Sequence, residues 1–190
     1  KFTFNGEIPY YLTAKDLILA VIGRIGFAGA TYKAMYFTGS GIGSLTLEDR
    51  MTLTNMAIEA GGKNGICDVD EKTLAYVKAR SNRPDWTVYT EDEGAEYDFE
   101  AAWDLESFEP LVAAPHSPDN TKTVSECKDV KLDRAYIGSC TGGKITDMIF
   151  AANILAGNTV KIPTFVVPGS TEVHSDMQRL GLNGEPVGPG

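Results

Sequence analysis

The sequence predicts an α/β fold with largely parallel sheets, and the clearest evidence lies in its last third. Ala135 to Ile137 are typical of a short buried strand, and apolar residues at helical spacing follow from 145 to 156. Thr164 to Val167 then indicates a second strand, about thirty residues after the first, which is the length of one strand–helix–strand unit. A further helix is expected over 171–180.

The first 115 residues also alternate between strand-like and helix-like segments. Thr13 and Asp16 have the spacing of a capping box before an apolar helix face that ends at Gly26. Thr46 and Asp49 have the same spacing before a second helix, which we expect to continue to Gly61. Strands are expected at 2–4, 32–37, 97–102 and 111–113, and a helix at 71–80 with Leu74 and Val77 in the core.

Composition predicts two incomplete domains. We expect one α/β domain over residues 1–115, a polar interdomain segment over 116–133, and the start of a second α/β domain over 134–190. The chain begins at a lysine and ends in a Gly- and Pro-rich stretch, so we expect an excerpt of a longer protein.

The charge and the cysteine count exclude several classes of function. The net charge of −9 gives no general attraction to nucleic acid or to an anionic membrane, so neither is expected as a partner. No apolar run approaches the roughly 18 residues that span a bilayer. Cys67, Cys127 and Cys140 are odd in number and irregularly spaced, which favours a reducing compartment, the cytoplasm, over a disulfide framework.

Cys140 lies in the loop between the predicted strand and the helix of the last third. Ligands of open parallel sheets sit at the carboxyl ends of strands, beside helix N-termini. There the helix dipole is expected to lower the pKa of a thiol, which would suit Cys140 to bind metal or to attack a substrate. A lone cysteine is also often a small buried apolar residue.

The same loop admits a nucleotide-binding interpretation. Residues 138–144 fit Gly-x-x-x-x-Gly-Lys, the phosphate-binding loop, but Ile145 stands where that loop requires a magnesium-binding hydroxyl. A second glycine-rich stretch, Gly39 to Gly43, has Ser44 where a dinucleotide fingerprint requires glycine.

Asn55 and Glu59 are four residues apart in the helix that begins after Thr46. On a continuous α-helix both side chains face the same way. By itself such a pair is more often a solvated helix face than a functional site.

Four segments resemble the aconitase superfamily, in the same order as in that family. They are residues 12–20 (Leu-Thr-Ala-Lys-Asp-Leu-Ile-Leu-Ala), residues 45–61 around Asn55 and Glu59, residues 115–120 (Pro-His-Ser-Pro-Asp-Asn), and residues 137–147 around Cys140. The loop at Cys140 is most similar to the isopropylmalate dehydratase branch. The resemblance implies aconitase-like three-layer α/β domains with largely parallel sheets, here incomplete.

The resemblance also implies a chemistry. The family dehydrates and rehydrates citrate-like acids at a [4Fe-4S] cluster that three cysteines hold, leaving one iron open as a Lewis acid. By position, Cys140 matches the first cluster ligand, Asn55 an asparagine beside the cluster, and Glu59 a glutamate that exchanges a proton with the iron-bound water. Cys67 and Cys127 match no ligand position, and we expect them to be structural.

Much of the family's site is expected outside this chain. The other two cluster cysteines would follow residue 190, and the catalytic serine and the substrate-binding arginines would belong to a small subunit that carries a swivelling domain.

The resemblance therefore implies part of an iron–sulfur lyase of leucine biosynthesis. It would act on a small-molecule substrate in the cytoplasm, or in the plastid stroma of a plant or alga, and the 190 residues alone are expected to be inactive. The alternatives are aconitase, homoaconitase and a catalytically dead fragment that only binds a partner.

Overall fold

The computed structural model describes residues 1–83 and 85–182 of the 190-residue chain. Residues pack into two compact units, Lys1–Lys128 and Asp129–Gly190, and each is described by itself. The division between them falls inside the segment 116–133, whose first part is built into the first unit.

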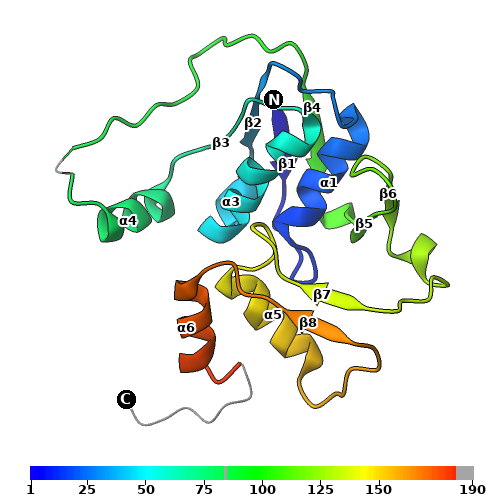
Figure 1. Cartoon of the computed structure of the whole chain (residues 1–190). Coiled ribbons are helices and arrows are strands. Elements are labelled where there is room, and N and C mark those ends of the chain that lie inside the picture. The colour runs from blue at the N-terminus through cyan, green and yellow to red at the C-terminus, as the bar shows by residue number, and fades with distance from the viewer. Residues whose placement is uncertain (84, 183–190) are drawn as a thin grey trace. The chain divides into compact units, whose positions relative to one another are not determined.

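The first unit is organised around a four-stranded sheet in which every pairing is parallel. Its strands are β1 (Phe2–Asn5), β2 (Ala34–Thr38), β3 (Asn64–Cys67) and β4 (Ala101–Asp104), in the order β3-β2-β1-β4 (Figure 1). The α/β class with a parallel sheet is therefore confirmed. Strand β4 lies at an edge, as expected, but it begins four residues later than the predicted strand at 97–102.

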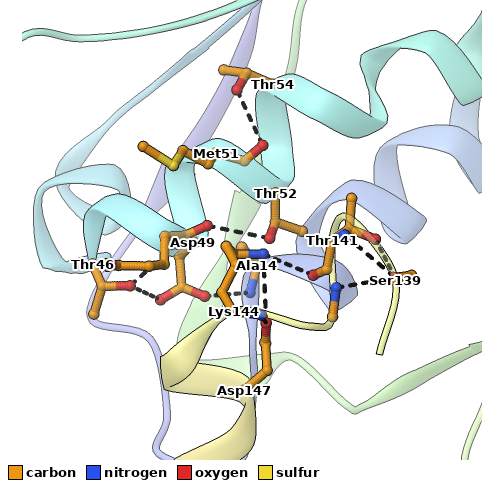
Figure 2. Close-up of polar contacts among 12 residues, drawn as sticks. Ala14, Thr46, Asp49, Met51, Thr52, Thr54, Ser139, Thr141, Lys144 and Asp147 are labelled. Carbon is orange, nitrogen blue, oxygen red and sulfur yellow. Dashed lines mark hydrogen bonds and ion pairs between the residues drawn. The ribbon is translucent and has the colours of Figure 1, made fainter. Parts of the chain in front are cut away.

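Two helices, α1 (Ala14–Ile25) and α3 (Leu47–Asn55), follow β1 and β2 along the chain and pack against each other (Figure 1). Both begin as the sequence predicts. The Asp16 carboxylate accepts a hydrogen bond from the backbone N–H of Thr13 at 2.9 Å, and Thr46 Oγ1 accepts one from the N–H of Asp49 at 3.1 Å. Figure 2 shows the Thr46 and Asp49 side chains in contact at the start of α3. A short helix, α2 (Ser40–Ser44), precedes α3.

The core lies between the sheet and these helices. Phe2, Phe4, Met35 and Phe37 alternate with more exposed residues along β1 and β2, which is the pattern of strands with one well-buried face. The Phe4 ring also stacks on Trp103 of the edge strand, with 5.3 Å between the ring centroids. The helices contribute the remaining core residues, among them Leu17, Ile18, Val21, Ile22 and Leu53.

Strand β3 was missed in the sequence because it is short and contains Gly65. A Cβ on Gly65 would lie 2.7 Å from the Cα of Thr54, so the glycine allows α3 to approach the strand closely. Strand β6 (Thr121–Thr123) was also missed, because its Thr-Lys-Thr sequence lacks apolar residues. It forms an antiparallel hairpin with β5 (Leu111–Ala113), which lies against α1. Two 3₁₀ turns, η2 (Leu105–Ser107) and η3 (Ser125–Cys127), flank this hairpin.

Helix α4 (Glu71–Arg80) forms where the sequence predicts it, but the prediction that Leu74 and Val77 enter the core is wrong. No residue of α4 is buried, and Figure 1 shows the helix standing away from the sheet. Polar contacts hold it instead. Arg50 on α3, whose side chain is 4% exposed, donates to the Asp70 carboxylate at 2.5 Å and to Thr73 Oγ1 at 3.2 Å.

The second unit contains one strand–helix–strand motif and a further helix. Strands β7 (Ala135–Ile137) and β8 (Thr164–Val166) pair in parallel, α5 (Ile145–Leu155) connects them, and α6 (Thr171–Arg179) follows. All four elements were predicted from the sequence, but the prediction that the strand at 135–137 is buried is wrong, because Tyr136 is exposed and its two neighbours are only half-buried. Tyr136 and Phe165 are paired in the register and are 60% and 53% exposed, so this small sheet leaves an apolar face uncovered.

Across the described residues, none of the helices combines the length and the apolar character needed to cross a membrane.

The Arg50–Asp70 contact predicts a pH-dependent contribution to stability. The Arg50 guanidinium holds the pKa of the Asp70 carboxyl below its usual value, so the stability that the contact contributes is fully present above the ordinary carboxyl pKa of about 4 and declines as pH falls from there toward the lowered pKa. In the full-length protein, we expect Asp70→Asn to lower the free energy of unfolding at pH 7 by about 1–2 kcal/mol, a range reduced for partial exposure of Asp70.

Urea denaturation between pH 7 and pH 3 measures this effect, and the difference from wild type should shrink toward pH 3. Glu71→Gln is the matched control, because it removes a charge from the same helical turn without touching Arg50. Equal losses in the two variants would contradict the prediction.

Candidate functional site

Asn55 and Glu59 lie at the end of α3, but the predicted continuous helix is wrong. The α-helix ends at Asn55, and a 3₁₀ helix, η1 (Met56–Ala60), carries Glu59. A 3₁₀ helix has 3.0 residues per turn, so a residue four positions along no longer lies on the same side. Asn55 is exposed, whereas Glu59 is half-buried.

Local backbone contacts explain the change of helix type. Thr54 Oγ1 donates to the carbonyls of Arg50 and Met51, and its contact with Met51 is drawn in Figure 2. Gly61 then adopts a left-handed conformation with φ 79°, and its N–H closes the last turn on the carbonyl of Ile58. Helix ends often tighten into 3₁₀ geometry in this way.

The segment that carries Glu59 is fixed at the edge of the sheet where the strands begin. The N–H of Ala30, just before β2, donates to the carbonyl of Ala60 at 2.9 Å, and β3 starts four residues after Ala60. Glu59 therefore lies at the end opposite to the carboxyl edge where open α/β sheets usually bind ligands.

Glu59 has an unusual hydrogen-bonding state. Its Oε2 atom is buried and has no hydrogen-bond partner among the described residues. A buried acceptor without a donor costs about 1–3 kcal/mol, and more when it is charged. The arrangement is therefore suited to a group that supplies a proton or a donor from outside the described chain.

Cys140 belongs to the second unit, in the loop from β7 to α5, as the sequence predicts. The loop turns on Ser139, which has φ 84°, a conformation that favours glycine. Ser139 Oγ accepts hydrogen bonds from the N–H groups of Thr141 at 3.3 Å and Gly142 at 3.1 Å, and Figure 2 shows it beside Thr141. The loop thus wraps around the Ser139 hydroxyl and leaves Cys140 exposed.

The end of this loop is locked to the loop that follows β8. The N–H of Gly169 donates to the carbonyl of Gly143 at 2.7 Å, and a Cβ on Gly143 would lie 2.6 Å from the carbonyl oxygen of Ser139. Lys144 Nζ donates to the carbonyl of Thr141 at 2.9 Å and lies 3.5 Å from Asp147. In the nucleotide-binding interpretation Lys144 would contact phosphate, but here its side chain contacts Thr141 and Asp147 of the same loop region.

The three cysteines differ in their suitability as metal ligands. Burial raises the pKa of the Cys67 thiol to about 12, so Cys67 stays protonated at neutral pH, packed against the core of the first unit. Cys127 is half-buried in the 3₁₀ turn η3, and Cys140 is the exposed one. Residues 1–83 and 85–182 contain no group of three or more His, Cys, Asp or Glu placed to hold a metal ion. Cys140 is therefore the most accessible of the three thiols.

The comparisons with known proteins match nearly the whole chain. The model of the aconitase family (aconitate hydratase) matches residues 1–131 and 120–185. The chain belongs to the aconitase family. An aconitase-like α/β fold agrees with this assignment and with the parallel sheet of the first unit.

The curated relatives of this chain include large subunits of 3-isopropylmalate dehydratase. The chloroplastic protein of Arabidopsis thaliana is 52% identical over 97% of this chain and 36% of its own length. The proteins of Clostridium kluyveri and Heliobacterium modesticaldum are 47% and 48% identical over 96% of this chain and 44% of theirs. The chain thus spans less than half the length of these relatives.

The structure places the expected site residues of this aconitase-family chain in different units. Asn55 and Glu59 share one segment of the first unit, and Cys140 lies in the second. Sequence reasoning missed the roles of Ser139 and Gly143, whose backbone positions shape the cysteine loop. The Gly142-Gly143 pair signalled a turn, but nothing marked Ser139 as a residue with positive φ.

The contact between the two loops of the second unit makes Gly143 sensitive to substitution. We expect Gly143→Ala to lower the melting temperature of the full-length protein by several degrees, because the new Cβ would collide with backbone atoms of Ser139 and Gly169. Differential scanning calorimetry measures the shift. Gly43→Ala in α2 is the control, since nothing lies within 4 Å of its Cβ. A melting temperature unchanged by Gly143→Ala would refute the steric argument.

Proposed function

We propose that this chain is part of the large subunit of an iron–sulfur hydro-lyase, 3-isopropylmalate dehydratase. The enzyme would interconvert 2-isopropylmalate and 3-isopropylmalate by dehydration and rehydration in leucine biosynthesis. The observation that supports this most strongly is the identity of 45–52% with dehydratase large subunits over more than nine-tenths of the chain. The exposed Cys140 and the buried Glu59 Oε2 are consistent with it.

Cys140 would provide one thiolate ligand to a [4Fe-4S] cluster. When bound, such a cluster supplies a Lewis acid that polarises the leaving hydroxyl. The exposure of Cys140 and the rigid loop around Ser139 suit a ligand whose partner thiolates come from other segments. One thiolate does not hold a four-iron cluster, so the remaining ligands would lie outside these 190 residues, and this chain alone would be inactive.

Glu59 would act as the proton carrier of the reaction. Its half-buried carboxyl group, in the protonated form, would supply the proton that turns the leaving hydroxyl into water, and the resulting carboxylate would take a proton back during rehydration. The lack of a donor to Oε2 supports this role, because no described side chain competes for that oxygen. Asn55, in the preceding helical turn, would donate its amide N–H toward the cluster.

The partner would be the small subunit, with the swivelling domain and the substrate-binding arginines. The relatives are named as large subunits, and one of them as chloroplastic. A protein from a plant or alga would then act in the plastid stroma, and a bacterial one in the cytoplasm.

Replacing the proposed ligand tests the cluster assignment. We expect Cys140→Ser in the full-length large subunit, reconstituted without oxygen, to lose bound iron and sulfide and the cluster absorbance. Cys127→Ser is the matched control and should keep the bound iron, the sulfide and the cluster absorbance. Full cluster loading and wild-type turnover of isopropylmalate in Cys140→Ser would rule out this ligand.

Replacing the proposed proton carrier tests the mechanism. Glu59→Gln keeps the shape of the side chain and removes the ionisable group, so kcat of the assembled enzyme should fall by roughly 10²–10⁴ while the cluster spectrum stays intact. Glu48→Gln, in the first turn of the same helical segment, should leave kcat unchanged. If Glu59→Gln retains activity but unfolds more readily, Glu59 has a structural role only.

A further inference from the structure

Thr54 lies in the last turn of α3, shortly before the 3₁₀ segment that carries Glu59. Its Oγ1 atom donates to the carbonyl of Arg50 at 3.1 Å and to that of Met51 at 3.2 Å, and Figure 2 shows the contact with Met51. A threonine that bonds to carbonyls of the preceding turn competes with the regular helical ladder and often bends the helix. The α-helix ends one residue later, at Asn55.

The backbone of Thr54 is also packed closely against the chain that forms β3. A Cβ on Gly65 would lie 2.7 Å from the Cα of Thr54 and 2.9 Å from its carbonyl oxygen. A Cβ on Gly62 would lie 2.9 Å from the carbonyl oxygen of Ala57, to which the N–H of Gly62 donates at 3.0 Å. Backbone contacts with residues 62–65 thus hold the chain on both sides of the change in helix type.

The direction of the Glu59 side chain depends on this backbone. Its Oε2 atom has no hydrogen-bond partner among the described residues, so no donor in that part of the chain holds this oxygen in place. Each residue of a 3₁₀ helix turns by about 120°, against about 100° in an α-helix. Over the three steps from Met56 to Glu59 the difference amounts to about 60°, which is enough to turn the carboxylate toward different neighbours.

We propose that Thr54 is the positioning residue for Glu59. The Thr54 hydroxyl holds the change of helix type at Asn55 and thereby sets the direction of the Glu59 carboxylate. Thr54 takes no part in the chemistry and acts only through the backbone of η1. Its effect on kinetics rests on the proposed function, whereas its effect on η1 rests on the hydrogen bonds of Thr54 alone.

Amide hydrogen exchange in the full-length protein tests the effect on η1. Thr54→Val removes the hydroxyl and keeps the branched shape, and Thr54→Ser keeps the hydroxyl. The N–H groups of Gly61 and Gly62 close the last turn of η1 on its own carbonyls. We expect both amides to exchange roughly tenfold faster in Thr54→Val and at the wild-type rate in Thr54→Ser. The amide of Gly26, which closes the end of α1, should be unchanged in both variants.

Steady-state kinetics of the assembled enzyme test the effect on Glu59. Thr54→Val should lower kcat by roughly tenfold to a hundredfold with little change in KM, because a small misplacement of a proton carrier slows the chemical step. In the Glu59→Gln background the same change should lower kcat no further, since residues that act through one group are not additive. Ser175→Ala is the control and should leave kcat unchanged. The Ser175 hydroxyl makes the same kind of bond, to the carbonyl of Thr171 at 3.0 Å, in a helix that does not carry Glu59.

Three results would overturn the proposal. Unchanged exchange of Gly61 and Gly62 in Thr54→Val would show that the hydroxyl does not hold η1. Faster exchange of Gly26 as well would assign the effect to general destabilisation. An equal fall of kcat with and without Glu59→Gln would show that Thr54 acts by another route. If Thr54→Val does not fold, Thr54→Ala replaces it, because alanine adds no methyl group beside the two carbonyls.

The two readouts separate this proposal from the proposed function. Wild-type kcat in Glu59→Gln would overturn the role of Glu59 as proton carrier. The exchange rates of Gly61 and Gly62 would still decide whether Thr54 holds η1, since they depend neither on activity nor on the cluster.

Discussion

The close packing of α3 on strand β3 fixes where the candidate catalytic segment lies. Leu53 is fully buried against the sheet, and Gly65 lets the backbone of α3 approach the strand. Because α3 is held along its length, its tightening after Asn55 turns Glu59 partly inward. The contact of Ala30 with Ala60 then holds the end of this segment against the start of β2. The geometry around Glu59 therefore follows from helix–sheet packing.

The cysteine loop obeys a different constraint, because its shape is set by backbone hydrogen bonds. Ser139 accepts from two N–H groups, and a Cβ on Gly143 would lie 2.6 Å from the carbonyl oxygen of Ser139 and 2.9 Å from the nitrogen of Gly169. The positive φ of Ser139, beside the exposed Cys140, is a local cost that the surrounding contacts must offset. The loop's hydrogen bonds thus fix its backbone while the Cys140 side chain stays exposed.

The sequence predicted the elements whose signals are local. The caps at Thr13 and Thr46, the helix at 71–80 and the strand–helix–strand motif around Cys140 all formed where side-chain spacing indicated. Tertiary contacts decided the rest. Strand β6 forms because it pairs with β5. Helix α4 is attached through the contact of Arg50 with Asp70 at its start, and not through buried apolar residues. The 3₁₀ helix that carries Glu59 depends on the conformation of Gly61 and on the hydrogen bonds from Thr54 Oγ1 to the carbonyls of Arg50 and Met51. The spacing of apolar residues in the sequence does not reveal these contacts.

Three features of the described residues are unusual for a folded domain. Glu59 buries an oxygen without a donor, Cys140 exposes a thiol, and Tyr136 and Phe165 expose an apolar sheet face. Each is unfavourable or inert by itself, since buried acceptors need donors and parallel sheets are normally covered on both faces. Sequences that keep such features usually do so because other groups complete them. In the enzyme proposed above, Glu59 and Cys140 would take part in the reaction, whereas the exposed sheet face has no assigned role.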